Sequence, residues 1–502
     1  MSSTEPSPES ELPSAQVSPP EPPVPPVRPF HDAVTVVCTV LLVIGVITTI
    51  LGSLEGTHYF ESFRQPLAVT AQFFDRELEL SEVPPPTAAW AQPLLPLLAT
   101  ELSEVHALVI RGLEEALEAH LRGTIPGTPE EVRLVEGRLA LVLGEAGKRD
   151  ELEERLHVLS AMGEKEAGLA EVIRYAYGLS DRPPSSKQVE KVLPLLTEPA
   201  RPAHTWATDR LEQRALRRLG HEEKASAAEA RILERGSRAL FWEWWLFGTI
   251  CVLGLVGLLL AVLGWVRRRP LPQVSSGVSP APWTGSEGYA MSVRTIVFSQ
   301  AGFFCMPDFS AVSLLLGSLL GWMPMMYYLT QRVPAAHGVP LSELFGLRRK
   351  APLASLLLVT LVLIALEQAF VMGLGIAGNS LEEGRWYEGV MEDLMRGGPA
   401  EAVGLFITAV LAAPLFEEIA FRGLVYTSLR VRFGPWFSAV VSAALFTLLH
   451  VYSPLGMVVL FTGAVVSALV YERTRSLLPS IIAHAVHNLW VVGTSLLVYR
   501  GA

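Results

Sequence analysis

Cysteine is scarce in this chain, which has three cysteines among 502 residues. Cys38 and Cys251 lie within long apolar stretches, and Cys305 lies close to the start of another. The polar segment between the first two apolar stretches contains none. These facts exclude a disulfide framework in that segment, and no pair has the Cys-x-x-Cys spacing of a zinc site.

Charged residues are also few, at 18% of the chain against 50% hydrophobic residues. Apolar stretches of roughly 18 residues or more explain this balance, and such stretches are typical of transmembrane helices. The formal charge of -10 is spread over acidic, mostly non-membrane segments. No basic face suited to nucleic acid is present, so we expect no nucleic-acid partner.

The N-terminal segment lacks the basic region and apolar core of a secretory signal peptide. Its first 30 residues contain ten prolines and several glutamates. We therefore predict that residues 1–32 form a disordered, Pro-rich tail with some polyproline II structure.

Two apolar stretches enclose a large polar segment. We predict transmembrane helices at 33–54 and 244–266, the second followed by Arg267-Arg268-Arg269. Basic clusters favour the cytoplasmic side, which places residues 55–240 on the extracytoplasmic side. Leu, Ala, Glu and Arg recur there at three- and four-residue spacing, which predicts a helical domain. Two glycine-containing turns in this domain loosely resemble those of tetratricopeptide-type helical hairpins. A generic helical bundle is an equal alternative. The partner of the domain is unknown.

A Pro/Gly/Ser-rich linker is predicted at 270–290, followed by a membrane core at 291–502. If the basic cluster at 348–350 faces the cytoplasm, an even number of membrane passes must separate it from Arg267–Arg269. The segment 309–329 supplies one pass. The less apolar segment 291–307 is the only candidate for the second. The other apolar segments are 353–376, 400–415, 436–450, 455–471 and 479–498. The predicted fold is all-α, a polytopic transmembrane helical bundle with an inserted extramembrane α-helical domain, in an inner or plasma membrane.

Two adjacent carboxylates, Glu417 and Glu418, follow an apolar run. A charged side chain near the bilayer centre costs about 2.5–3.5 kcal/mol on the insertion scale, so such residues usually have a function. On a helix Glu418 and Arg422 are one turn apart and can form an ion pair. Glu417 faces a different direction and is left free to act. The alternative is that these are interfacial charges that end a membrane span.

Other polar groups recur in later apolar segments. His450 lies one turn after Phe446, and His484 and Asn488 lie one turn apart on one helical face. A carboxylate and an imidazole can remove a proton from water, and an amide with a second imidazole can donate hydrogen bonds to an oxyanion. A glutamate with two histidines is also a legitimate zinc shell. The residues alone leave both arrangements open.

Three motifs carry a resemblance to a known family: Glu-Glu-x-x-x-Arg at 417–422, Phe-x-x-x-His at 446–450 and His-x-x-x-Asn at 484–488. In this order they resemble the CPBP (Abi) family, which includes the Ras-converting type of CAAX prenyl endopeptidase. The resemblance covers about residues 309–498. It implies an intramembrane endopeptidase that cleaves a membrane-associated or lipidated, CAAX-like protein in the lipid bilayer.

The resemblance also implies a role for each motif residue. Glu417 with His450 would activate the hydrolytic water, and His484 with Asn488 would stabilise the oxyanion. Arg422 would anchor Glu418. In a metalloprotease version zinc would be bound by Glu417, His450 and His484, but a metal-free mechanism is equally open.

Three more polar residues lie near these segments. We expect Glu367 to be hydrogen-bonded to a neighbouring helix rather than to line the catalytic cavity. We expect His487 to be a helix-packing residue, and Asp308 to be a helix N-cap or interface residue. The functional alternative is a non-proteolytic membrane scaffold or bacteriocin self-immunity protein. A scaffold has no physical need for carboxylates inside a membrane helix.

Overall fold

The structure is a computed structural model. It describes residues 33–55, 63–85, 102–198, 204–268, 272–275, 281–304, 311–331, 338–377, 392–450, 452 and 454–500. These residues form helices and no strands, which confirms the predicted all-α fold. The predictions for the tail 1–32 and for Asp308 lie outside the described residues.

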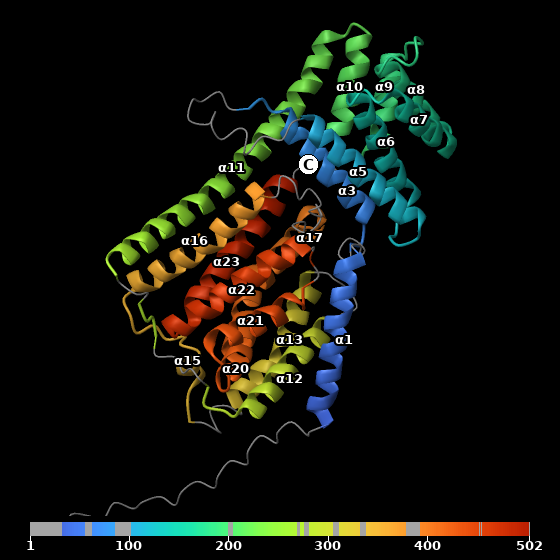
Figure 1. Cartoon of the computed structure of the whole chain (residues 1–502). Coiled ribbons are helices and arrows are strands. Elements are labelled where there is room, and N and C mark those ends of the chain that lie inside the picture. Colours follow the sequence, from blue (N-terminus) through green and yellow to red (C-terminus); the bar gives the residue numbers. More distant parts are fainter. Residues whose placement is uncertain are drawn as a thin grey trace, which may run out of the picture.

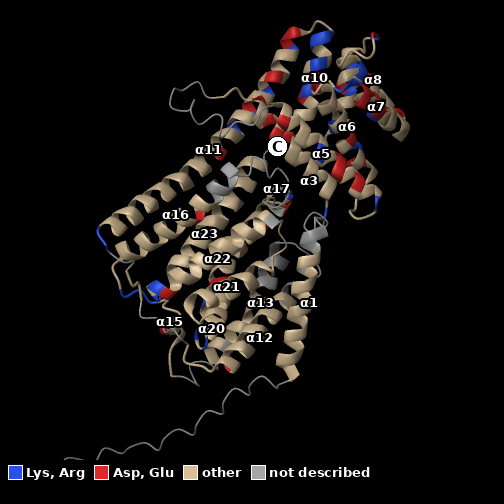
Figure 2. Ribbon diagram, in the orientation of Figure 1, with Lys and Arg blue, Asp and Glu red and all other residues tan. Residues whose placement is uncertain are grey.

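A bundle of long helices makes up most of the molecule, and a group of shorter helices lies at one end of it (Figure 1). Five helices in the described part of the chain are long and apolar enough to cross a membrane, which makes this a multi-pass membrane protein. They are Glu222–Val266, Leu353–Phe370, Pro399–Arg430, Leu455–Thr474 and Leu478–Tyr499. Figure 2 agrees, because Lys, Arg, Asp and Glu gather in the short helices and are sparse along the bundle.

The bundle contains further helices around these five. The first is α1 (Ala33–Glu55), and α12 (Gly285–Phe304) packs along α13 (Ala311–Gln331). The elements nearest the motifs are α16 (Leu353–Ala377), α21 (Pro435–Thr447), α22 (Pro454–Thr474) and α23 (Leu478–Thr494). The segment 272–275 runs beside residues 348–351, where the Lys350 N–H donates to the Val274 carbonyl at 3.0 Å. The chain that follows the first basic cluster therefore lies beside the second cluster at 348–350.

The extramembrane domain consists of helices α3 (Pro66–Glu82), α5 (Leu102–Leu121), α6 (Pro129–Glu145), α7 (Arg149–Met162), α8 (Glu164–Ala176), α9 (Ser186–Val192) and α10 (Trp206–Arg218). Gly147 joins α6 to α7 and Gly220 joins α10 to the next helix, both with φ near +75°. This left-handed conformation favours glycine. The two predicted glycine turns are therefore real turns between helices.

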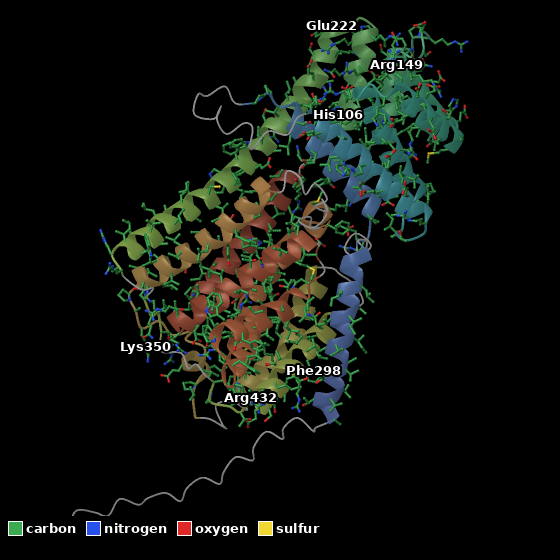
Figure 3. The ribbon with its side chains drawn as sticks, in the orientation of Figure 1. His106, Arg149, Glu222, Phe298, Lys350 and Arg432 are labelled. Carbon is green, nitrogen blue, oxygen red and sulfur yellow. The ribbon has the colours of Figure 1, made fainter. Side chains whose placement is uncertain are left out.

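Helix α11 (Glu222–Val266) was not foreseen as one element. The predicted domain boundary at residue 240 and the predicted start of a span at 244 both fall inside this continuous helix of 45 residues. Residues 237–243 contain no glycine or proline to end it. In Figure 3, Glu222 lies at the extramembrane end of the molecule and Lys350 lies near the opposite end.

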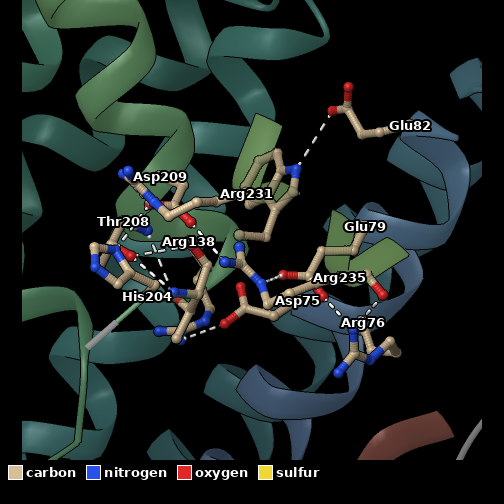
Figure 4. A network of polar contacts seen from close by, with 12 residues as sticks. Asp75, Arg76, Glu79, Glu82, Arg138, His204, Thr208, Asp209, Arg231 and Arg235 are labelled. Atoms are coloured by element: carbon tan, nitrogen blue, oxygen red, sulfur yellow. Dashed lines mark hydrogen bonds and ion pairs between the residues drawn. The ribbon is translucent and has the colours of Figure 1, made fainter. Parts of the chain in front are cut away.

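Buried ion pairs join the domain to α11 (Figure 4). The Arg138 guanidinium lies 2.6 Å from the Asp75 carboxylate, and Glu79 lies 2.5 Å from both Arg76 and Arg235. Arg235 belongs to α11 and also contacts Asp209 of α10 at 2.7 Å. Because α11 continues into the bundle and packs along α16, this network connects the domain to the membrane helices.

The domain also contacts the bundle at the C-terminal end of the chain. A π-helical turn, η7 (Ser495–Tyr499), extends α23 toward α3. The Tyr499 ring stacks on Phe73 with 4.9 Å between centroids, and its hydroxyl donates to Glu77 at 2.7 Å. The short helix α17 (Glu392–Arg396) reaches the domain through the ion pair between Arg396 and Glu198.

Candidate active site

Glu417 and Glu418 lie in the middle of one long helix, Pro399–Arg430. The predicted span at 400–415 ended before the glutamates, but the structure continues the helix beyond them. The two charges therefore lie within a continuous helix and not at its end. The helix comprises α18 (Pro399–Phe406), η5 (Ile407–Ala412), α19 (Ala413–Glu418), η6 (Ile419–Tyr426) and α20 (Thr427–Arg430), of which η5 and η6 are π-helical.

Pro414 leaves a backbone carbonyl without a helical partner, and Asn488 of the third motif binds to it. The Ala413 N–H bonds the Thr408 carbonyl, five residues back, as in a π-helix. The next carbonyl, that of Ala409, would bond residue 414, but proline has no N–H. The Asn488 side chain donates to this carbonyl instead, at 2.7 Å. The proline in the motif helix therefore creates the acceptor that holds Asn488 of α23 in place.

Glu418 and Arg422 form the predicted ion pair. Arg422 Nη1 lies 3.1 Å from Glu418 Oε1, and both side chains are almost fully buried, at 4% and 1% exposed. The guanidinium also lies over the Phe446 ring, 4.7 Å from its centroid, in a cation–π contact. Phe446 of α21 thus helps to hold the arginine that holds Glu418.

His484 lies between the two glutamates. Its Nδ1 is 3.3 Å from Glu418 Oε1, and its Nε2 is 3.9 Å from Glu417 Oε2. The ring therefore faces a carboxylate with each nitrogen. Glu418, held by Arg422, orients the imidazole, and the second nitrogen points toward the free carboxylate of Glu417.

His450 lies in the turn that follows α21, which ends at Thr447 rather than at the predicted residue 450. Its Nδ1 is 2.7 Å from the Phe446 carbonyl oxygen. A carbonyl only accepts hydrogen bonds, so Nδ1 carries a proton, and in a neutral ring Nε2 would be the nitrogen without one. This is the tautomer that a general base needs.

The predicted residues line one cavity of about 230 Å³. Helices α16, α22 and α23 and the motif helix supply its walls, and the loop after α21 supplies His450 and Tyr452. All seven residues of the three motifs contribute to the lining: Glu417, Glu418, Arg422, Phe446, His450, His484 and Asn488. Three motifs spread over residues 417–488 therefore meet at one place in the fold.

Residues 399–490 match the family model described as Type II CAAX prenyl endopeptidase, Rce1-like. This part of the chain is an Rce1-like domain. The match begins with the motif helix and ends two residues beyond Asn488, so it contains all three motifs. No curated protein and no solved structure matches the chain at a comparable level. The family consists of intramembrane endopeptidases of the CAAX type, which agrees with the resemblance found in the sequence.

Two polar residues outside the three motifs also line the cavity. Glu367 of α16 lines the cavity of the Rce1-like domain instead of bonding a neighbouring helix, and it interacts electrostatically with His484. His487 also lines the cavity, while its ring packs near Trp490 with 6.2 Å between centroids. The adjacent polar residues Glu367 and Gln368 point in different directions on a helix, and nothing in their spacing tells which neighbours those faces will meet, so the cavity-lining position of Glu367 could not be read from the sequence.

Tyr452 is a cavity residue that the motif analysis missed. Its ring stacks on His450 with 6.2 Å between centroids, and it lines the cavity of the Rce1-like domain. Its position two residues after His450 was the available signal.

The zinc arrangement does not fit the residues as they stand. Glu417, His450 and His484 do not bring their ligand atoms within 4.8 Å of one another. Among the described residues the set that meets this distance is His204, Asp209 and Glu212 in the extramembrane domain. There Arg231 already contacts Asp209 at 2.7 Å and Glu212 at 2.5 Å, and supplies the positive charge. We therefore derive no step through a metal.

Proposed function

We propose that this chain hydrolyses a peptide bond of a membrane-associated or lipidated protein, using a water activated by Glu417 and His450. The observation that carries the proposal is the single cavity in which two glutamates, two histidines and an asparagine face one another among apolar helices. The Rce1-like match of residues 399–490 supports the reaction class.

The water is activated by two proton acceptors. Glu417 has its carboxylate free of the Arg422 ion pair, and the unprotonated Nε2 of His450 is available because Nδ1 is bound to a backbone carbonyl. One of them removes a proton from water, and the resulting hydroxide attacks the carbonyl carbon of the substrate. The other keeps the water oriented for attack.

The tetrahedral oxyanion is stabilised by His484 and Asn488. Asn488 uses one amide N–H on the Ala409 carbonyl, which leaves its second N–H for the substrate oxygen. His484, protonated on both nitrogens, donates from Nδ1 to Glu418 and from Nε2 to the oxyanion. The proton taken from water then passes to the leaving amine, and the C–N bond breaks.

The substrate chemistry follows from the cavity walls. Leu366, Phe370, Val459 and Leu460 add apolar surface next to the polar groups. Such a site favours an apolar or lipid-modified segment next to the scissile bond. Because the site lies within the membrane helices, the substrate must itself be associated with the membrane. We place the chain in an inner or plasma membrane.

The test is cleavage of quenched fluorescent membrane peptides by the full chain in lipid nanodiscs. Glu417→Gln and His450→Ala should each lower kcat by a factor of about 10² or more, as expected for loss of acid–base catalysis. Glu401→Gln, in the first turn of α18 of the same helix, is the matched control and should retain wild-type activity. Full activity in both site variants would disprove the assignment. Absence of cleavage by wild type across prenylated and unmodified peptides would favour the scaffold alternative.

A further inference from the structure

A second cavity adjoins the first, and Glu417 and His450 line both. The second cavity lies on the other side of the motif helix, against α12 and α13. The two proposed proton acceptors therefore form the wall between two spaces. One contains the remaining motif residues, and the other contains none of them.

The second cavity is small, at about 70 Å³. Its walls come from α12, α13, the motif helix and the end of the α21 segment: Ile296, Ser299, Gln300, Trp322, Glu417, Ala420, Phe421, Leu449 and His450. This space cannot hold a peptide segment. It has room for several water molecules, since each needs about 10–15 Å³ of probe-occupied volume.

Polar groups are placed where such waters need them. A buried water is held by about two to four polar partners. Glu417 and His450 supply two, and α12 adds Ser299 and Gln300. The Ser299 hydroxyl donates to the Ile296 carbonyl at 2.8 Å, so its oxygen is left as an acceptor. The Gln300 amide can both donate and accept.

Close packing of α12 and α13 holds this wall in position. A Cβ on Gly321 of α13 would lie 2.7 Å from the Ser299 carbonyl oxygen, so only glycine allows this approach. One residue further along α13, the Trp322 ring stacks on Phe416 with 5.3 Å between centroids. Ser299 and Gln300 are therefore held at a fixed distance from the motif helix.

We propose that the second cavity binds the hydrolytic water and that Gln300 is its positioning residue. The inference rests on the proposed function, because it names the source of the nucleophile for that same site. Peptide enters the main cavity and meets Asn488 and His484. Water approaches Glu417 and His450 from the α12 side, loses its proton there, and forms the new C–O bond. A hydrolase inside apolar helices needs such a route, because its second reactant is excluded from lipid.

The test measures kcat and KM separately for cleavage of the membrane peptides by the full chain in lipid nanodiscs. Gln300→Leu should lower kcat by about 10-fold to 100-fold, the effect expected of a misplaced reactant, with KM within about twofold of wild type. Gln300→Asn, which keeps the amide, should recover most of the lost rate. Gln331→Leu, at the last residue of α13, is the matched control and should leave both constants unchanged.

A second pair of variants tests the cavities themselves. Ala420→Val narrows the second cavity and should lower kcat, whereas Ala464→Val narrows the main cavity and should raise KM. If Gln300→Leu and Ala420→Val both keep wild-type kcat while Glu417→Gln is inactive, the water route is wrong and the proposed function stands. If Glu417→Gln is also active, the proposed function fails, and the water route fails with it.

Discussion

Removal of the Arg422 charge is the sharpest test of how the site is held together. Arg422→Met keeps a long side chain but deletes the guanidinium that pairs with Glu418 at 3.1 Å. Glu418 is 1% exposed, so its carboxylate cannot gain water in exchange. The same change removes the cation–π contact with Phe446.

The expected cost is large. Breaking a buried ion pair by removing one partner costs about 3–5 kcal/mol, because the remaining charge is left buried and uncompensated. The lost cation–π contact adds roughly 0.5–2 kcal/mol. His484 should also lose its fixed orientation, since the oxygen that binds its Nδ1 is the one that Arg422 holds.

The assay is a double-mutant cycle on the full chain, with unfolding measured by denaturing-detergent titration in mixed micelles. Arg422→Met alone should be the least stable form. Glu418→Gln combined with Arg422→Met should recover at least about 2 kcal/mol of that loss, because the double variant leaves no orphaned charge. Additive effects of the two changes would refute the reasoning, since they would mean that the two side chains do not interact.

Three further outcomes follow from the structure. Pro414→Ala supplies an N–H to the Ala409 carbonyl and should release Asn488. In the same peptide assay kcat should fall by on the order of 10², the effect of losing one oxyanion donor. In the extramembrane domain burial opposes ionisation of Glu145, but hydrogen bonds from Arg214 hold its pKa below the usual value of 4.5. The Glu145–Arg214 pair therefore stabilises the domain above about pH 4.5, and this stability is lost as the pH falls through the pKa of Glu145 in the folded protein. Hydrogen exchange of the α6 amides at decreasing pH should show this loss of protection. Glu145→Gln should abolish the pH dependence of the protection. Strong chelators should leave peptide cleavage unchanged, whereas loss of activity that zinc restores would contradict the metal-free mechanism.

Helical spacing was enough to predict the contacts within one helix. The Glu418–Arg422 pair follows from residues four apart in sequence, as does the common face of His484 and Asn488. The three motifs meet at one cavity because of tertiary packing, which helical spacing does not predict. Their meeting could still be expected, because charged side chains in a membrane must be sheltered from lipid.

Tertiary packing, and not helical spacing, determines which cavity a polar side chain lines. Glu367 and Gln300 each have a polar neighbour in the sequence, Gln368 and Ser299, but nothing in the local sequence tells which cavity they line. The sequence also did not predict that Pro414 provides the acceptor for Asn488. A proline in a helix predicts an unsatisfied carbonyl, but the donor that satisfies it comes from Asn488, 74 residues later.

Composition did not show that one helix crosses the predicted domain boundary. The change from charged to apolar residues near 240 indicated the end of one element and the start of another. The backbone has no reason to stop there, because a helix ends at glycine, proline or a cap rather than at a change of environment. Helix α11 therefore continues from the domain into the bundle.

Acids are matched by arginines in the ion-pair network of the domain, whereas acids outnumber arginines in the main cavity. In the domain Asp75 is matched by Arg138, and Glu79 by Arg76 and Arg235. The main cavity contains three carboxylates, of Glu367, Glu417 and Glu418, but a single guanidinium. Uncompensated acids inside apolar helices cost stability, and such groups cluster where a protein uses them. A structural network has no need of the surplus carboxylates, whereas a site that must accept a proton from water does.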